Sequence, residues 1–207
     1  MIFIINKRDV AGMEDELTYN EPLQRRRGAW NTKDILITGM IGVVFAFVLI
    51  AVTYAYFPLA AVLGPGYSRI MDGIFMIPGL MALYLIRKPG AGLVAMTIGG
   101  LVTLPFSPYG LIGIAWSAVA GLECETPFLA VRYRKYSALF LMISGSIATL
   151  ISTLLEYPLY GHAGLSVGVQ ITMLAVTAVS GAIGGFLSKW LADATLKSGL
   201  LADYRRS

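Results

Sequence analysis

Acidic side chains inside apolar segments are the residues of this sequence most able to do chemistry. Glu123, Glu125 and Glu156 lie in or at the edge of long apolar runs, and Asp72 begins another such run. Burying a charge in hydrocarbon is costly, so acids in such places tend to have a function or a partner. Glu123 and Glu125 point about 200° apart on a helix, so at most one of them faces a given cavity. The alternative is that each glutamate bonds to a neighbouring helix or to Arg132.

Aromatic residues near these acids could form one wall of a binding site. Trp116 lies seven residues before Glu123, and Tyr109 precedes it. A cation over an indole face gains about 0.5–2 kcal/mol, so such a wall suits a flat or cationic ligand. Anchoring in the membrane interface explains a Trp and a Tyr here equally well. For the outer cluster of Tyr157, Tyr160 and His162, anchoring is the better explanation.

Signatures of several enzyme classes are missing from the sequence. It contains no G-x-x-x-x-G-K-[ST], G-x-S-x-G or H-E-x-x-H motif. His162 is the only histidine and Cys124 the only cysteine, which excludes a His/Cys metal site and an internal disulfide. We therefore expect no catalytic residue, no cofactor and no metal. An intramembrane enzyme using Glu123 and Glu125 would need a base, metal or nucleophile at matching depth, and we find none.

The composition places these residues in a membrane. Of 207 residues, 57% are hydrophobic and 14% are charged, whereas soluble domains carry about 25% charged residues. Twelve charged residues precede residue 35, and only eleven lie in residues 35–191. That stretch cannot cover itself with a polar surface, so lipid must cover it.

Six apolar segments predict an all-α integral membrane protein with six transmembrane helices. They are residues 35–57, 73–86, 91–104, 111–131, 137–156 and 167–191. The second and third are short and are joined by Arg-Lys-Pro-Gly at residues 87–90, a turn signal that predicts a helical hairpin. Residues 1–34 are predicted to be a polar cytosolic N-terminal tail, residues 35–191 the transmembrane domain, and residues 192–207 a basic cytosolic C-terminal end.

The positive charges predict that both termini are cytosolic. With six spans, fifteen of the sixteen Lys and Arg residues fall on the side of the termini, and only Arg69 falls outside. The three outer segments, 56–72, 105–110 and 157–166, are short. A ligand from outside must therefore bind between these loops and the outer ends of the helices.

Small residues give the first segment a face that another helix could approach closely. Gly42 and Ala46 lie four residues apart and therefore share one side of the helix. The partner could be another helix of this chain or another subunit.

Three motifs together resemble one transporter family. They are R-K-P-G-A at residues 87–91, P-Y-G-L-I-G at 108–113 and G-L-E-C-E-T-P-F-L-A-V-R-Y-R at 121–134. They are similar to those of YkoE-type S-components, the substrate-binding membrane subunits of energy-coupling factor (ECF) vitamin transporters. Such subunits are associated with thiamin or its hydroxymethylpyrimidine precursor. The resemblance covers roughly residues 30–200.

The resemblance implies a multi-pass protein of the bacterial plasma membrane that is not an enzyme. Such a subunit captures its vitamin from outside and hands it to a transmembrane coupling subunit and ATPase subunits. It would contact the coupling subunit through Gly42 and Ala46. Glu125 matches the acidic position of the family pattern G-x-x-x-E-x-x-F. Family members carry further acids where this chain reads Tyr-Ser-Arg at 67–69 and Ala-Met-Thr at 95–97, so Asp72 or Glu123 would substitute for them.

We therefore predict a substrate site made of two aromatic residues and four acids: Trp116, Tyr67, Glu125, Glu123, Asp72 and Glu156. Glu125 would bind the pyrimidine edge with both oxygens, and Trp116 would stack on a ring. Asp72, Tyr67 or Glu156 would close the outer side. Two alternatives stay open, namely another vitamin or heterocyclic precursor on the same architecture, and an assembly subunit that binds no ligand.

Overall fold

The computed structural model describes residues 30–198, and every regular element among them is helical. The greater part of the predicted N-terminal tail (1–29) and the last nine residues of the predicted C-terminal end (199–207) lie outside the described residues. The α-helices are α2 (Thr32–Tyr67), α3 (Asp72–Ile86), α4 (Ala91–Thr103), α5 (Leu111–Ala130), α6 (Ala138–Tyr160) and α7 (Val167–Lys197). Three short 3-10 helices connect some of them, namely η1 (Ser68–Met71), η2 (Leu104–Phe106) and η3 (His162–Gly164).

Several of these helices are suited to a membrane. Thr32–Ile86, which contains α2 and α3, Ala138–Tyr160 and Val167–Lys197 are long and apolar enough to cross one, and Ala91–Phe106 is a shorter apolar segment. Large apolar side chains are exposed along α2, among them Met40 and Phe47, and lipid is the natural cover for such a surface. The all-α membrane class is therefore confirmed. The count of six spans and the cytosolic location of the termini stay predictions.

The first helix is longer than predicted at both ends. It begins at Thr32 because Asn31 caps it: the Asn31 side chain accepts a hydrogen bond from Asp34 N (2.8 Å), and the Asp34 carboxylate accepts one from Asn31 N (3.0 Å). The outer loop predicted over residues 56–72 is helical as far as Tyr67. Pro58 is accommodated within the helix, and the predicted break occurs only at Gly64, whose φ of 71° suits glycine.

The predicted hairpin between the second and third helices is confirmed. α3 ends at Ile86 and α4 begins at Ala91, and the turn uses left-handed backbone at Arg87 and Gly90. Lys88 in this turn lies 2.5 Å from Asp34 of α2, and both side chains are buried. Asp34, predicted to belong to the polar tail, is thus part of the packed helical core.

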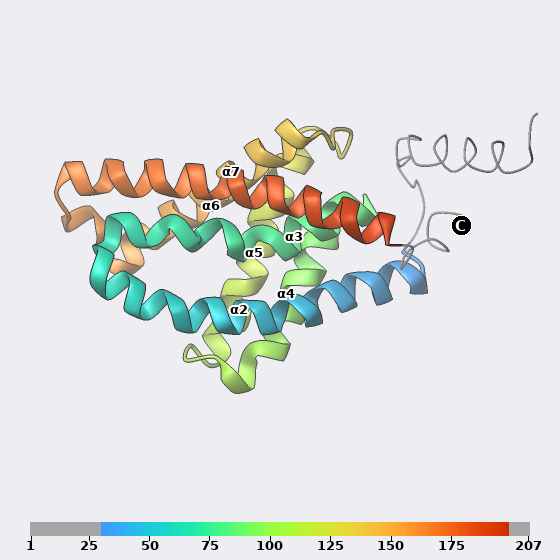
Figure 1. Cartoon of the computed structure of the whole chain (residues 1–207), viewed down its shortest axis with the longest axis horizontal. Coiled ribbons are helices and arrows are strands. Elements are labelled where there is room, and N and C mark those ends of the chain that lie inside the picture. The colour runs from blue at the N-terminus through green and yellow to red at the C-terminus, as the bar shows by residue number, and fades with distance from the viewer. Residues whose placement is uncertain (1–29, 199–207) are drawn as a thin grey trace, which may run out of the picture.

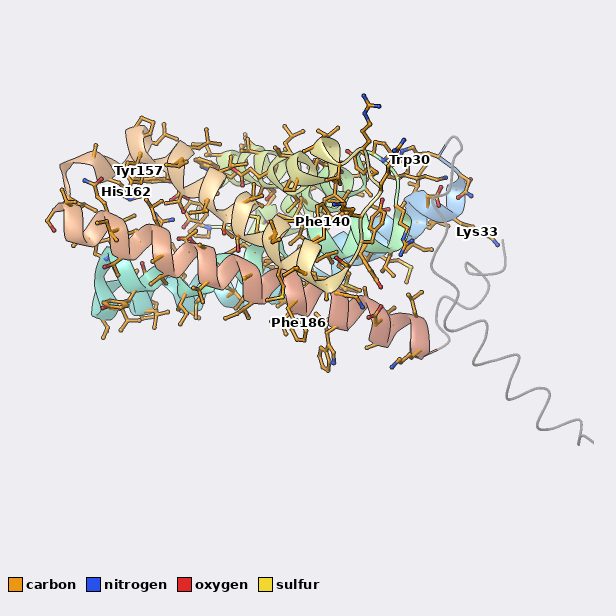
Figure 2. The ribbon with its side chains drawn as sticks, turned by 90° about the horizontal axis from the view of Figure 1, so that it is seen from above. Trp30, Lys33, Phe140, Tyr157, His162 and Phe186 are labelled. Atoms are coloured by element: carbon orange, nitrogen blue, oxygen red, sulfur yellow. The ribbon has the colours of Figure 1, made fainter. Side chains whose placement is uncertain are left out.

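α3 packs against both α2 and α7, while α4 packs against α2 and α5. Figure 1 shows the start of α2 and the end of α7 at the same end of the molecule. Figure 2 places Tyr157 and His162 at the end opposite Trp30 and Lys33. The described helices therefore begin and finish on one side, with the α6–α7 connection on the other.

Glycines allow α7 to approach its neighbours at backbone distance. A Cβ atom at Gly181 of α7 would overlap the carbonyl of Gly145 and the hydroxyl of Thr149, both on α6. A Cβ atom at Gly73 of α3 would overlap the carbonyl of Ser180 on α7. The Ser180 hydroxyl accepts from Gly73 N (2.8 Å) and donates to the carbonyl of Ile70 (2.7 Å). These contacts fix the start of α3, which carries Asp72.

Candidate functional site

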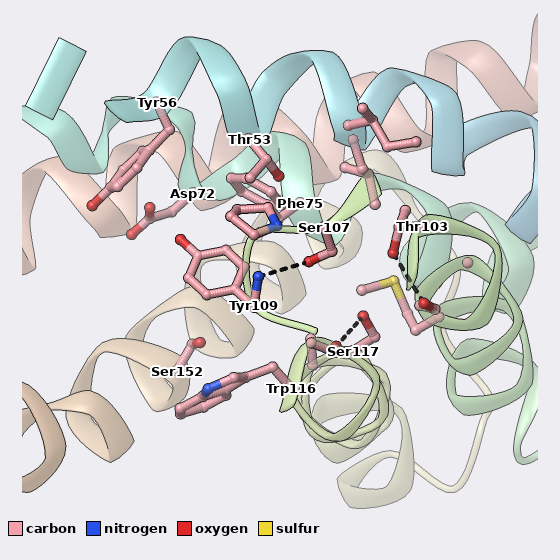
Figure 3. Close-up of a pocket in the computed structure, with 18 of the residues that line it drawn as sticks. Thr53, Tyr56, Asp72, Phe75, Thr103, Ser107, Tyr109, Trp116, Ser117 and Ser152 are labelled. Carbon is pink, nitrogen blue, oxygen red and sulfur yellow. Dashed lines mark hydrogen bonds between the residues drawn. The ribbon is translucent and has the colours of Figure 1, made fainter. Parts of the chain in front are cut away.

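A cavity of about 510 Å³ lies among α2, α3, α4, α5 and α6. Its lining combines aromatic rings with hydroxyl and charged groups. Figure 3 shows Tyr56, Phe75, Tyr109 and Trp116 around the same space as Asp72 and Ser152. A concave site with a mostly apolar lining and a few polar groups is typical of small-molecule binding.

Three of the six predicted substrate-site residues meet in this cavity. Trp116 comes from α5, Asp72 from the start of α3 and Glu156 from the C-terminal part of α6. Trp116 is half-buried in the wall. Tyr67 does not join them: its side chain is exposed and lies beside a separate shallow hollow between the end of α2 and the start of α7.

The expected role of Glu125 as the ligand-binding carboxylate does not agree with its position. It is buried and is not among the lining residues. Its Oε1 accepts from the backbone N–H of Gly92 at 2.9 Å, and its Oε2 accepts from the hydroxyl of Tyr133. Tyr133 has left-handed backbone with φ of 54°, an uncommon conformation for this residue type. Glu125 therefore ties the end of α5 to the start of α4.

Glu123 has the opposite character. It is 3% exposed, and neither carboxylate oxygen has a hydrogen-bond partner. Like Glu125, it is not among the residues that line the cavity, but it interacts with two residues of α6 that are, Ser152 and Glu156. A buried polar group without a partner is costly, so Glu123 is a group to which a ligand could offer a hydrogen bond.

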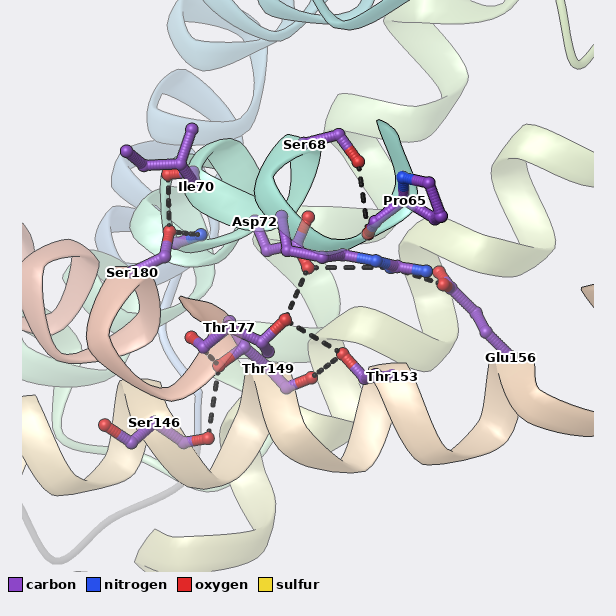
Figure 4. A network of polar contacts seen from close by, with 12 residues as sticks. Pro65, Ser68, Ile70, Asp72, Ser146, Thr149, Thr153, Glu156, Thr177 and Ser180 are labelled. Carbon is purple, nitrogen blue, oxygen red and sulfur yellow. Dashed lines mark hydrogen bonds and ion pairs between the residues drawn. The ribbon is translucent and has the colours of Figure 1, made fainter. Parts of the chain in front are cut away.

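Arg69 is a cavity residue that the sequence reasoning missed. Its Nη1 lies 2.5 Å from Glu156 Oε2 and 3.5 Å from Asp72 Oδ2, and its side chain is 8% exposed. Figure 4 shows this arrangement, in which Thr177 also donates to Asp72 Oδ2 at 3.2 Å. We call Arg69, Asp72 and Glu156 the Arg69 cluster. One signal pointed to it: Arg69 is the only cation that the predicted topology places outside.

The only histidine of the chain closes the same end of the cavity. His162 stacks on Tyr160 at 5.9 Å between ring centroids and meets Tyr157 edge-on at 5.7 Å. Burial, followed by the nearby charge of Arg69, lowers the pKa of His162 below its usual value of about 6.5. The imidazole is therefore uncharged at neutral pH. Among residues 30–198, no group of three or more His, Cys, Asp or Glu side chains could hold a metal ion.

The two residues of the predicted coupling-subunit contact, Gly42 and Ala46, are buried within this chain. Ala46 is fully buried, and a Cβ atom at Gly42 would overlap the carbonyl of Ala95 on α4. These small residues therefore allow α2 and α4 to approach each other within this chain. Exposed alanines of the same helix are Ala51, Ala55 and Ala61.

The position of Glu125 leads to a prediction about stability. Glu125→Ala should lower the melting temperature, because it leaves Gly92 N–H and the Tyr133 hydroxyl without their acceptor. Hydrogen bonds to a charged group contribute about 1.5–3 kcal/mol each, so a fall of several degrees is expected. Thermal unfolding of the purified protein would measure it. A variant as stable as the wild type would contradict this structural role.

An apolar helical bundle that encloses a cavity lined by aromatic and charged side chains is typical of a membrane protein that binds a small molecule. Comparison with known proteins gives the family. Residues 33–151 match the family model of the permease component of the ABC-type cobalt transport system. The chain is 36% identical to the HMP/thiamine permease protein YkoE of Bacillus subtilis (strain 168) over 175 residues, 84% of this chain and 88% of that protein.

A solved structure agrees with this match. The crystal structure of an S-component of an ECF transporter is similar with a TM-score of 0.79 and 35% identity, covering 84% of this chain and 89% of that one. This chain belongs to the S-components of ECF transporters. It is therefore a multi-pass protein of the plasma membrane and a transport subunit, not an enzyme. It has a small-molecule substrate and works with ECF coupling and ATPase subunits.

Proposed function

We propose that this S-component captures thiamin or its hydroxymethylpyrimidine precursor from outside the cell and hands it to the coupling subunits. The observation that carries the proposal is that Trp116 and the Arg69 cluster line the same cavity. The similarity to a protein named HMP/thiamine permease supports the same ligand class.

The cavity chemistry suits the thiazolium ring of thiamin. This ring is flat and permanently cationic, and a cation near an indole face gains about 0.5–2 kcal/mol. The Arg69 cluster contains two carboxylates and one guanidinium, so it carries one net negative charge when both acids are ionised. A monovalent cation neutralises it.

The pyrimidine part of the ligand is assigned to Glu123. An aminopyrimidine presents a donor and an acceptor side by side, which a protonated carboxyl group can bind with both oxygens: one accepts from the amino group and the other donates its proton to the ring nitrogen. Glu123 has both oxygens unpartnered, whereas those of Glu125 are occupied within the fold. We therefore assign to Glu123 the contact expected of Glu125.

The proposed topology has six spans, with the termini in the cytosol and the cavity opening outward. The start of α2 and the end of α7 lie at one end of the molecule (Figure 1), and Tyr157 and His162 lie at the other (Figure 2). Positively charged residues gather on the cytosolic side of membrane proteins, and the exposed residues Arg132 and Arg134 follow α5.

We assign the coupling-subunit contact to the exposed side of α2, at Ala51 and Ala55.

Calorimetry on the purified protein tests this function. Thiamin and hydroxymethylpyrimidine should each bind saturably, and riboflavin, whose fused three-ring system differs in shape, should not. The cavity provides the shape and the charge for the first two. Saturable binding of riboflavin alone, or of none of the three by folded protein, would contradict the proposal.

A further inference from the structure

Arg69 is placed where a positively charged ligand would be expected to bind. It is the only Lys or Arg in the cavity lining, and its guanidinium lies between the two acids of that lining, Asp72 and Glu156. The protein thus supplies its own cation to the same carboxylates that a thiazolium would approach.

The main chain around Arg69 is held by hydrogen bonds, so a separation of Arg69 from Glu156 would require a movement of the Arg69 side chain. Arg69 belongs to η1, whose Ile70 carbonyl accepts from Ser180 of α7 at 2.7 Å. Ser180 also accepts from Gly73 N, and Ser68 donates to the carbonyl of Pro65 at 3.4 Å. The two ion pairs differ in what else holds the acid: Asp72 also accepts a hydrogen bond from Thr177, whereas Arg69 is the only ion-pair partner of Glu156 among residues 30–198.

One atom of the guanidinium is still free to bind a ligand. Arg69 Nε is buried and has no hydrogen-bond partner among residues 30–198. A buried donor in this state favours an added acceptor, and an uncharged heterocycle can provide one without breaking either ion pair. A cationic ring has to share or displace the guanidinium at Glu156.

We propose that Arg69 is a specificity-determining residue that acts as an internal counter-cation, which a positively charged ligand displaces from Glu156. Arg69 thereby sets how strongly the cavity prefers cationic over uncharged heterocycles. This inference rests on the proposed function, because it concerns the same cavity and the same two ligands. The quantity it determines is the ratio of the affinities for thiamin and for hydroxymethylpyrimidine.

A charge series tests the inference by calorimetry, at a pH at which the pyrimidine is uncharged. Arg69→Gln adds one net negative charge to the cluster and should raise thiamin affinity about tenfold, with pyrimidine affinity changed less than about threefold. Glu156→Gln removes one negative charge and should lower thiamin affinity by a similar factor. The double variant Arg69→Gln/Glu156→Gln restores the original net charge and should return thiamin affinity to within about threefold of the wild type. Arg134→Gln, an exposed substitution after α5, is the control and should change neither ligand.

Separate outcomes contradict the inference and the proposed function. If the wild type binds both ligands and the affinity ratio is the same in all variants, the role of Arg69 is wrong and the function stands. A fall in thiamin affinity with Arg69→Gln in folded protein also overturns it. If Arg69→Gln does not fold, the ratio of thiamin to pyrimidine affinity in Glu156→Gln and in the double variant tests the inference instead. Wild-type protein that binds neither ligand overturns both.

Discussion

Replacing Glu123 with alanine is expected to weaken thiamin and hydroxymethylpyrimidine binding by roughly tenfold to 100-fold. The reason is the loss of two hydrogen bonds to the pyrimidine, each of which contributes about 0.5–1.5 kcal/mol. Within residues 30–198, Glu123 makes no hydrogen bond of regular geometry and has the Ser152 hydroxyl as a polar neighbour, so its removal should cost the described fold little. The melting temperature should therefore stay within a few degrees of the wild type. Calorimetry and thermal unfolding on the same preparation give both values.

Glu125→Ala is the matched control on the same helix. It removes the same side chain two residues away and should show the reverse pattern, with a lower melting temperature and a dissociation constant close to that of the wild type. The contrast arises because Glu125 holds Gly92 and Tyr133, whereas Glu123 faces Ser152 of the cavity wall. Loss of binding in Glu125→Ala at full stability, with none in Glu123→Ala, would reverse our assignment.

Gly181→Val is expected to destabilise the protein strongly. A side chain there would overlap backbone atoms of Gly145 and the Thr149 hydroxyl, so α6 and α7 have to move apart. Overpacking of this kind costs about 3 kcal/mol or more, which corresponds to a fall of roughly 6–12 °C in melting temperature for a chain of this size. Thermal unfolding in detergent measures it.

Gly168→Val in the first turn of α7 is the control for that substitution. It introduces the same residue into the same helix, but a Cβ atom at Gly168 meets nothing within 4 Å. Its melting temperature should stay close to that of the wild type. Equal losses in both variants would mean that valine in α7 is harmful for reasons other than the contact with α6.

Local signals explain the parts of the fold that the sequence predicts well. An uninterrupted apolar run defines most of α2, and the turn residues at 87–90 mark the α3–α4 hairpin. The continuation of α2 as far as Tyr67 was not predictable in the same way. Pro58 is compatible either with a loop or with a helix that accommodates it, and the surrounding chain decides between them.

The candidate site depends on contacts between distant parts of the chain, which limits its prediction. Helical geometry indicates that Glu123 and Glu125 point in different directions, but not which of them faces a cavity. Gly92 and Tyr133 engage both oxygens of Glu125, which leaves Glu123 as the carboxyl group open to a ligand. The pairing of Arg69 with Glu156 likewise joins η1 to α6, and no spacing in the sequence predicts it. The same holds for Gly42, whose neighbour on α4 becomes known only from the packing.

The most direct test of the account is an experimentally determined structure of the protein with thiamin bound. We predict ligand density in the cavity between Trp116 and the Arg69 cluster, with the pyrimidine edge on Glu123 and the thiazolium near Glu156. Ligand density beside Glu125 would contradict the account. So would ligand density outside the cavity together with an intact Arg69–Glu156 ion pair.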